Sequence, residues 1–458
     1  MKDVLSFVRT IRDPIYDEVR MTEIENKIID TPIFQRLRWI SQLSGVREVY
    51  PSAVHTRFTH SVGVMYLAGR YAQEVFKYHD DVTEKTQLAR LAGLLHDIGH
   101  GPFSHTYDDV VFKRVYPNEA HGHDKHRDKI VKSEFIKPLL EEFINPEDLM
   151  KIWDGRSELL HPLLQGVLGA DRLDFMLRDS TFAGTLHFGI IAINRIINNT
   201  TIQQHQGKDA IHYNWKVLDD IYSSLIGRFF EYKNVYFHKT ARAADITIHA
   251  MLSEACEPLE LVERTNNLSK YIYLNEYTLI GEIFANQSNE LAKAKAYLKD
   301  LLDRRLHKAV WEKIIDESTA KSLGITINEL CKLTAQESFI KNVIKYGKDT
   351  NLNLKHKMKI DSTYKLSTIN ELEFQTSNIY IYDPYNRISS GTKSFTLSKA
   401  LNTTKYISTF SGSSAYRTLF TLVRVYAHPE DVKNVNQIWN DIRSQEEESS
   451  MNVSLTSY

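Results

Sequence analysis

The feature that most constrains this chain is a histidine–aspartate doublet, His96-Asp97, at the end of an apolar stretch. Residues 87–96 carry apolar side chains at helical spacing, and residues 99–102 (GHGP) follow almost at once. Glycine and proline end helices, so the sequence predicts that a helix stops at the doublet. Two more histidines lie within nine residues of His96. Because the chain must turn here, we expect these polar side chains to converge.

Imidazole and carboxylate groups elsewhere in the chain can complete a metal site with the doublet. His60 is the candidate imidazole, and Asp171 is the candidate carboxylate. Such a mixed nitrogen and oxygen set binds divalent metal ions. Asp174 and Asp179 compete with Asp171, because residues one helical turn apart lie on neighbouring faces. Spacing alone leaves open which of the three aspartates binds the metal.

The composition excludes several classes of protein. The chain has 458 residues and a formal net charge of −1, so no overall basic field favours duplex nucleic acid. Two cysteines form no disulfide framework and suit a reducing compartment. The N-terminus does not resemble a signal peptide, and no apolar run is long enough to cross a bilayer. We therefore expect a cytoplasmic protein without membrane contact, with nucleic acid an improbable partner.

Helical periodicity dominates the first two-thirds of the sequence. Residues 66–78 and 87–96 have apolar side chains at helical spacing, and residues 218–260 contain no proline until Pro258. We predict a mainly α fold, with a helical body over residues 1–340.

The character of the sequence changes beyond about residue 350. Residues 378–384 and 404–410 are rich in β-branched and aromatic side chains, which favours strands. Residues 419–426 are either a buried strand or a short helix. We predict a smaller α+β C-terminal lobe over residues 341–458.

Several motifs follow one another in a fixed order. They are residues 29–38 (IDTPIFQRLR), 56–61 (TRFTHS), 96–105 (HDIGHGPFSH), 171–175 (DRLDF) and 236–239 (YFHK). Together they resemble the HD-domain deoxynucleoside triphosphate triphosphohydrolases, especially the SAM-and-HD-domain branch and its bacterial relatives. The resemblance runs from Asp13 to about residue 245, and more weakly to Tyr426. It implies an HD-domain helical body, and we expect no SAM domain before it.

The resemblance implies one divalent metal ion per chain, held by His60, His96, Asp97 and Asp171. These ligand types do not identify the ion as Fe, Mn, Zn, Ni or Mg. A further Mg can accompany the nucleotide triphosphate. We expect no second histidine–carboxylate group close enough in pattern to hold another ion.

The resemblance also implies a catalytic set, which comprises His100, His105, Asp108 and His123. An imidazolium can protonate a leaving 5′-oxygen as general acid. We expect His105 in that role, oriented by Asp108 one helical turn later. His121 and His126 compete with His123, whose distance from His105 fits the family pattern better.

A second implied set binds the substrate: Gln42, Leu43, Arg57, Arg172, Phe175, Asp179, Arg228 and Tyr236. The arginines would bind the triphosphate, because guanidinium groups make bidentate phosphate contacts. Gln42 and Asp179 would bind the sugar 3′-hydroxyl, and Tyr236 would exclude a 2′-hydroxyl. Leu43 would pack on sugar or base. Phe175 replaces a tyrosine of the family, which removes one hydroxyl contact to the triphosphate.

A third implied set binds regulatory nucleotides between subunits of a homotetramer. It comprises Arg9, Asp30, Gln35 and Arg38 for a guanine nucleotide (GTP or dGTP) and His238 and Lys239 for a second nucleotide. The alternative is plainly structural. Asp30 would then be the N-cap of a helix that begins at Pro32, and Arg38 would be an ordinary surface charge.

The leading hypothesis is therefore an enzyme that hydrolyses a dNTP to deoxynucleoside and inorganic triphosphate. One alternative is an HD-type nucleotidase or phosphodiesterase that acts on another phosphorylated ligand. Another is a module that senses nucleotides or binds single-stranded nucleic acid and whose catalytic site is vestigial.

Overall fold

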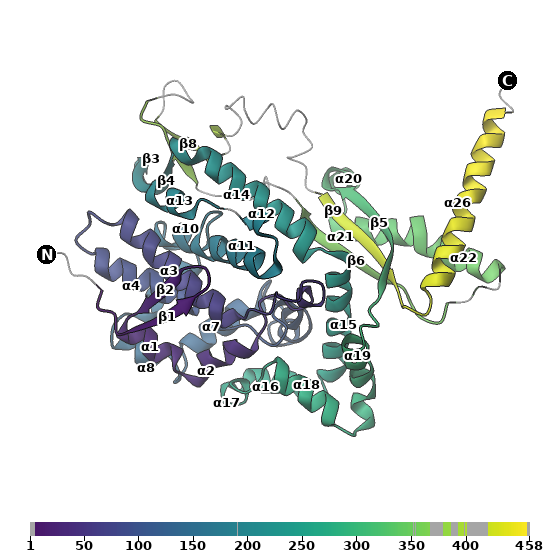
Figure 1. Ribbon diagram of the computed structural model, residues 1–458, viewed down its shortest axis with the longest axis horizontal. Coiled ribbons are helices and arrows are strands. Elements are labelled where there is room, and N and C mark those ends of the chain that lie inside the picture. Colours follow the sequence, from purple (N-terminus) through teal and green to yellow (C-terminus); the bar gives the residue numbers. More distant parts are fainter. Residues whose placement is uncertain are drawn as a thin grey trace.

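The fold is mainly α, as predicted, with a helical body and a small lobe that contains a sheet (Figure 1). The computed structural model describes residues 5–350 except 190, then 352, 354–366, 379–385, 393–400 except 398, and 420–455. In Figure 1 the body occupies the left and centre, and the lobe lies at the right.

Three helices at the centre of the body carry the candidate metal ligands. They are α3 (Arg57–Val75), α4 (Val82–Leu95) and α11 (Ala170–Ala183). Helix α3 packs against both of the others, and most of its side chains are buried. The predicted helices over 66–78 and 87–96 are confirmed, although α3 begins nine residues earlier.

The other helices of the body surround these three. They are α1 (Glu23–Ile29), α2 (Pro32–Gln35), α5 (His105–Tyr107), α6 (Lys113–Val115), α7 (Gly122–Val131), α8 (Lys137–Glu141), α9 (Pro146–Trp153), α10 (Leu160–Gln165), α12 (Leu186–Gly189), α13 (Ile193–Asn198), α14 (Leu218–Glu231), α15 (Lys239–Ala255), α16 (Leu261–Asn266), α17 (Leu268–Tyr271), α18 (Glu276–Ala285) and α19 (Ala292–Leu302). Two π-helical turns, Asp108–Phe112 and Tyr232–Tyr236, interrupt them at candidate site residues. Such turns are frequent at functional sites.

Two hairpins in the body were not anticipated from the sequence. One joins β1 (Arg9–Asp13) to β2 (Asp17–Met21), and the other joins β3 (Thr200–His205) to β4 (Lys208–Asn214). In the second, Gln206 and Gly207 have positive φ angles of 51° and 81°, as a two-residue hairpin turn requires. The sheet continues from β4 through β7 (Tyr380–Tyr382) to β8 (Ser394–Thr396).

The lobe is built on a three-stranded antiparallel sheet in the order β5 (Lys308–Asp316), β9 (Phe420–Ala427), β6 (Lys359–Leu366). Its helices are α20 (Glu317–Ser322), α21 (Ile327–Ala335), α22 (Lys341–Asp349) and α26 (Val432–Leu455). Strand β9 settles the choice at residues 419–426 in favour of a strand. Strand β7 confirms the strand within 378–384, whereas residues 404–410 lie outside the described residues.

A second hydrophobic core lies beneath this sheet and draws on residues before and after position 341. It joins Cys331 and Phe339 to Val423, Val425 and Ile438. Because this core includes residues on both sides of position 341, it marks no boundary there. The division of the chain into 1–340 and 341–458 stays a prediction. Within the described part of the chain, none of the helices has the length and apolar character needed to cross a membrane.

Candidate active site

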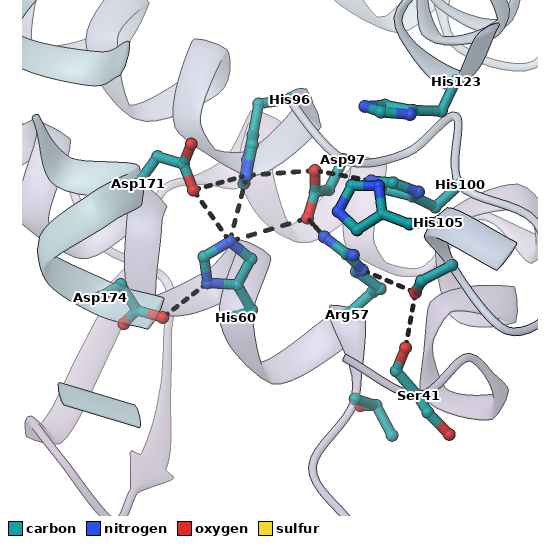
Figure 2. Close-up of polar contacts among 12 residues, drawn as sticks. Ser41, Arg57, His60, His96, Asp97, His100, His105, His123, Asp171 and Asp174 are labelled. Carbon is teal, nitrogen blue, oxygen red and sulfur yellow. Dashed lines mark hydrogen bonds and ion pairs between the residues drawn. The ribbon is translucent and has the colours of Figure 1, made fainter. Parts of the chain in front are cut away.

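The four side chains expected to bind a metal come from three helices and meet at one point (Figure 2). His60 lies in the first turn of α3, and Asp171 lies in the first turn of α11. His96 caps the C-terminal end of α4, with Asp97 directly after it. The predicted end of a helix at the doublet is confirmed, and it lets both side chains of the doublet face α3.

The ligand atoms are spaced as they would be around one ion. The two Nε2 atoms of His60 and His96 lie 3.2 Å apart. Asp171 Oδ1 lies 3.2 Å from His60 Nε2 and 3.6 Å from His96 Nε2. Asp97 lies 3.6 Å from the first and 3.4 Å from the second of these nitrogens. Adjacent ligands at bond lengths of about 2.1 Å lie about 3.0 to 3.4 Å apart, so the set fits a single divalent ion.

The tautomers of both imidazoles support this reading. His96 Nδ1 lies 2.7 Å from the Gly93 carbonyl, and His60 Nδ1 lies 2.8 Å from Asp174 Oδ2. Both partners only accept hydrogen bonds, so each Nδ1 carries a proton and each Nε2 is left to face the other ligands. At 3.2 Å the two Nε2 atoms need either a shared proton or a cation between them. A metal ion suits that position.

The charges of the site fit the same conclusion. Burial alone would lower the pKa of His60, but its hydrogen bonds to Asp171 and Asp174 raise the pKa to about 10. Without a metal, His60 Nε2 therefore carries a proton at neutral pH, and a bound ion would take the place of that proton. Burial opposes ionisation of Asp97, yet the Arg57 guanidinium, 2.5 Å away, holds the pKa of Asp97 well below its usual range. The pKa of Asp171 is also lowered, against burial, by its hydrogen bonds with His60 and His96. Both carboxylates are thus ionised at neutral pH, as metal ligands must be.

The three aspartates that sequence spacing offered as metal ligands have different surroundings in the structure. Asp171 reaches the ligand cluster, whereas Asp174 lies behind His60. Asp174 also accepts hydrogen bonds from Tyr16 and Arg178, and it is fully buried. A Cβ at Gly63 would lie 2.0 Å from Asp174 Oδ1, so only glycine admits this carboxylate beside α3. Asp179, in contrast, accepts a hydrogen bond from Tyr236, among the residues expected to bind substrate.

The four expected catalytic residues form a second cluster beside the first. Asp108 Oδ2 lies 2.8 Å from His123 Nδ1 and 3.3 Å from His105 Nδ1. The rings of His100 and His123 stack at 3.8 Å. His100 Nε2 also lies 3.4 Å from Asp97 Oδ1, so the two clusters touch. The His105 side chain is 70% exposed and open to an incoming ligand.

The carboxylate of Asp108 organises this cluster. Burial would raise its pKa, but hydrogen bonds with His105 and His123 hold it well below the usual range. Burial likewise opposes the charged form of His123, yet the hydrogen bond to Asp108 raises the pKa of this imidazole. Asp108 was expected to orient His105, but its shorter contact is with His123.

The neighbouring histidines lie elsewhere. His121 is exposed, and its ring contact is with His123. His126 is buried, where Tyr116 and Tyr271 contact its ring, and burial lowers its pKa well below the usual range. Of the three, His123 makes the contacts with Asp108.

The expectation that no second histidine–carboxylate group lies close enough for an ion was wrong. Ligand atoms of His100, His105, Asp108 and His123 all lie within 4.8 Å of one another. Sequence spacing missed this because α7 returns His123 to the turn that follows α4. Gly99 permits the approach, since a Cβ there would lie 2.0 Å from the His123 carbonyl oxygen. Burial and the charge of Arg57 hold the pKa of His100 well below the usual range, and the same charge opposes a second cation here.

The expected substrate-binding residues lie along the next stretch of α11 and around it. The Tyr236 hydroxyl donates to Asp179 Oδ2 at 2.6 Å, and its ring lies 6.4 Å from that of Phe175. Leu43 packs in the same small apolar cluster as Tyr236. Gln42 is buried, and its Oε1 has no hydrogen-bond partner among the described residues.

The three arginines differ in their surroundings. Arg57 is buried and donates to Asp97 and to Ser104 Oγ, so it holds one of the candidate metal ligands directly. Arg172 follows Asp171 on α11, and the Arg228 guanidinium lies over the Tyr232 ring on α14.

Sequence reasoning missed several supporting residues. Glu276, fully buried, accepts hydrogen bonds from the Ser41 amide and hydroxyl and from the Phe103 amide. Phe103 and Ser104 have positive φ angles of 63° and 49°, which is unfavourable for residues other than glycine. Backbone strain of this kind has no sequence signature. Glu276 was missed because it lies far along the chain from Ser41 and Phe103. His55, 2.7 Å from Asp179, was also missed.

The residues expected to bind guanine nucleotide lie near the N-terminal hairpin. Arg9 pairs with Asp30 at 3.1 Å, and Arg38 donates to Gln35 at 2.8 Å. The alternative in which Asp30 caps the helix at Pro32 is wrong. Thr31 is that N-cap, and Asp30 instead ends α1.

The other two residues expected to bind a regulatory nucleotide, His238 and Lys239, line a cavity of about 400 Å³ between α14, α15 and the lobe sheet. Arg424, Lys233 and Glu312 line the same cavity.

Comparisons with known proteins agree with this site. The HD domain profile matches residues 57–176, which include the four candidate ligands. The uncharacterized protein MJ1154 of Methanocaldococcus jannaschii is 33% identical over 65% of this chain and 58% of its own. The Dictyostelium discoideum deoxynucleoside triphosphate triphosphohydrolase SAMHD1 homolog is 28% identical over 67% of this chain and 61% of its own. The chain thus spans about three-fifths of the length of these relatives. The crystal structure of a hypothetical protein from Aquifex aeolicus, 25% identical, has a TM-score of 0.70 over 94% of this chain and 99% of its own.

Proposed function

Because the chain belongs to the SAMHD1-like branch of the HD-domain family, we propose that it hydrolyses dNTPs to deoxynucleoside and inorganic triphosphate. The observation that carries this proposal is the contact between two clusters. A four-residue metal set meets a histidine–carboxylate set where His100 approaches Asp97 at 3.4 Å. A phosphate ester placed there would have a metal ion, acting as a Lewis acid, on one side and a proton-donating histidine on the other.

A divalent ion held by the metal set would polarise a phosphoryl oxygen and lower the pKa of a water. Water then attacks the α-phosphorus, and the bond to the nucleoside 5′-oxygen breaks. His105, exposed and hydrogen-bonded to Asp108, donates a proton to that oxygen. Asp108 raises the pKa of His123 and, through its other hydrogen bond, orients the His105 ring.

The residues around α11 would determine which nucleotide binds as substrate. Arg57, Arg172 and Arg228 would balance the charge of the triphosphate. Gln42 and Asp179 would bind the 3′-hydroxyl, and Tyr236 would leave no room at the 2′ carbon. The buried and unpartnered Gln42 Oε1 supports this assignment, because a ligand hydroxyl would satisfy it. Leu43 and Phe175 would pack on the remaining faces of the nucleotide.

Regulation by guanine nucleotides belongs to the same proposal. Arg9, Asp30, Gln35 and Arg38 would bind GTP or dGTP, and the cavity at His238 and Lys239 would take a second nucleotide. Lys233, Lys239 and Arg424 give that cavity cations suited to phosphates. Nucleotides shared between subunits would stabilise a cytoplasmic homotetramer.

Product analysis tests the proposal. The full chain is incubated with each dNTP and with Mn²⁺, Mg²⁺, Fe²⁺, Ni²⁺ or Zn²⁺, and anion-exchange chromatography separates the products. Intact inorganic triphosphate is expected, with Asp97→Ala inactive. Orthophosphate or pyrophosphate would instead indicate a nucleotidase of another type. Binding of dNTP without turnover under every metal condition would indicate a nucleotide-sensing module.

A further inference from the structure

A group of histidines lies at one end of the lobe sheet, far from the site above. Strand β9 is central and is followed directly by His428. Lys308 of β5 pairs with Ala427, so the preceding residue, His307, lies beside His428. On the other side, Lys359 of β6 pairs with Tyr426, which brings His356 to the same end. Figure 1 shows these strands side by side at the right of the molecule.

The rings are in direct contact. His356 and His428 stack with centroids 3.8 Å apart, and His307 meets His428 edge-on at 5.6 Å. Ligand atoms of His356, His428 and Glu430 lie within 4.8 Å of one another. Two imidazoles and one carboxylate are typical ligands of zinc and similar transition metals. We propose that His356, His428 and Glu430 bind a Zn²⁺-type ion, at a second metal site that is independent of the first.

Asp431 prepares His356 for this role. It is 2% exposed and accepts hydrogen bonds from the amides of Lys355 and His356. Its Oδ2 also lies 3.1 Å from His356 Nδ1. A carboxylate that binds one ring nitrogen fixes the tautomer and leaves the other nitrogen for a metal, as at many zinc sites.

The present contacts of His428 and Glu430 are weak enough for an ion to replace them. His428 Nδ1 accepts a long hydrogen bond of 3.3 Å from the Glu430 amide. The Glu430 carboxylate pairs with Lys355 at 3.4 Å, an exposed contact that contributes little in water. His307 is buried, and its Nδ1 finds no hydrogen-bond partner in the described part of the chain. A third imidazole thus lies beside the three proposed ligands.

An ion at this site would connect separate segments of the lobe. His356 precedes β6, whereas His428 and Glu430 form the turn from β9 into α26. His307 lies where the chain leaves the body for β5. Because only the folded lobe brings these segments together, metal binding should stabilise it.

Metal counting tests the proposal on the full chain. The protein is stripped with a chelator, incubated with Zn²⁺ and desalted, and bound zinc is measured by elemental analysis. The wild type should hold two ions, and His428→Gln and Glu430→Gln should each hold one fewer. His79→Gln, which changes an exposed histidine of the body, should match the wild type. Equal zinc in the lobe variants and the wild type would overturn the proposal.

An Asp97→Ala background distinguishes zinc bound in the lobe from zinc bound at the candidate active site. That variant should keep one Zn²⁺, and the ion should raise its melting temperature. Adding Glu430→Gln, an exposed change that spares the core, should abolish both effects. If Asp97→Ala binds no zinc, the lobe site does not exist, whether or not the wild type hydrolyses dNTPs. Circular dichroism of each variant identifies any that fail to fold, and Glu430→Gln then carries the test.

Discussion

Asp174 Oδ2 lies 2.8 Å from His60 Nδ1, so a carboxylate outside the metal set fixes the orientation of a ring inside it. Asp174 is fully buried, and Arg178 holds it through two hydrogen bonds. Burial would raise the pKa of Asp174, but the Arg178 charge lowers it to about 2. The carboxylate therefore stays ionised and keeps the proton on His60 Nδ1.

Asp174→Asn should weaken metal binding by roughly 10- to 100-fold, the usual effect of losing a carboxylate behind a histidine ligand. The amide still accepts a hydrogen bond but no longer makes His60 more basic. Metal affinity is measured by competition with a chelator, and a melting curve checks the fold. Asp109→Asn, an exposed neighbour of the site, serves as control. Unchanged affinity would show that Asp174 only packs.

His105→Ala should lower turnover by about 10²-fold or more, because it removes a positioned proton donor. The metal should remain, since His105 lies in the other cluster. Steady-state kinetics and metal content are measured together, with His121→Ala as an exposed control. Near-normal turnover would transfer the general-acid role to His100 or His123.

Tyr236→Ala should raise activity on NTPs relative to dNTPs, because a ring against the 2′ carbon excludes a hydroxyl by clash. Tyr236→Phe keeps the ring and loses only the hydrogen bond to Asp179, so it should still discriminate. The ratio of kcat/KM for GTP and dGTP measures the effect. Equal use of the two nucleotides by the wild type would remove the basis for this assignment.

Glu231 should make stability depend on pH. Burial, and then the charge of Asp179, raise its pKa from 4.5 to about 8. Between these values the folded protein keeps a proton that the unfolded chain has lost, so stability falls as pH rises. Relative to Glu231→Gln, the wild type should lose stability from pH 4.5 to about 8 and no further above it. Denaturant melts across this range provide the measurement, and parallel curves for the two proteins would contradict the raised pKa.

Guanine nucleotide should promote assembly through the Arg9–Asp30 pair. We expect a homotetramer whose mass or rate increases with dGTP or GTP, and Asp30→Asn should reduce that response. Light scattering and activity are recorded with and without nucleotide. Asp17→Asn breaks a similar exposed pair with Arg12 on the same hairpin and should have no effect. A fully active monomer that ignores nucleotide would leave Asp30 with a structural role only.

The sequence by itself determined the helices and the place where the doublet ends one of them. These features are local: apolar spacing defines α3 and α4, and glycine and proline stop the helix after His96. The order of the motifs also indicated the family. Hairpin β3–β4 is local too: Gly207 is a turn residue between the two strands, and Gln206 and Gly207 adopt the positive φ angles of a two-residue turn.

Only the tertiary structure decided which side chains meet. Asp171, Asp174 and Asp179 lie on one helix and look alike in sequence, but their contacts differ. Asp171 meets Nε2 of His60, Asp174 meets Nδ1 of the same ring, and Asp179 accepts a hydrogen bond from Tyr236. The packing of α3 against α11 makes that choice. In the lobe, His307, His356 and His428 share no motif, and the register of three strands brings them together. Contacts between residues distant in the chain depend on how elements pack, which local spacing does not encode.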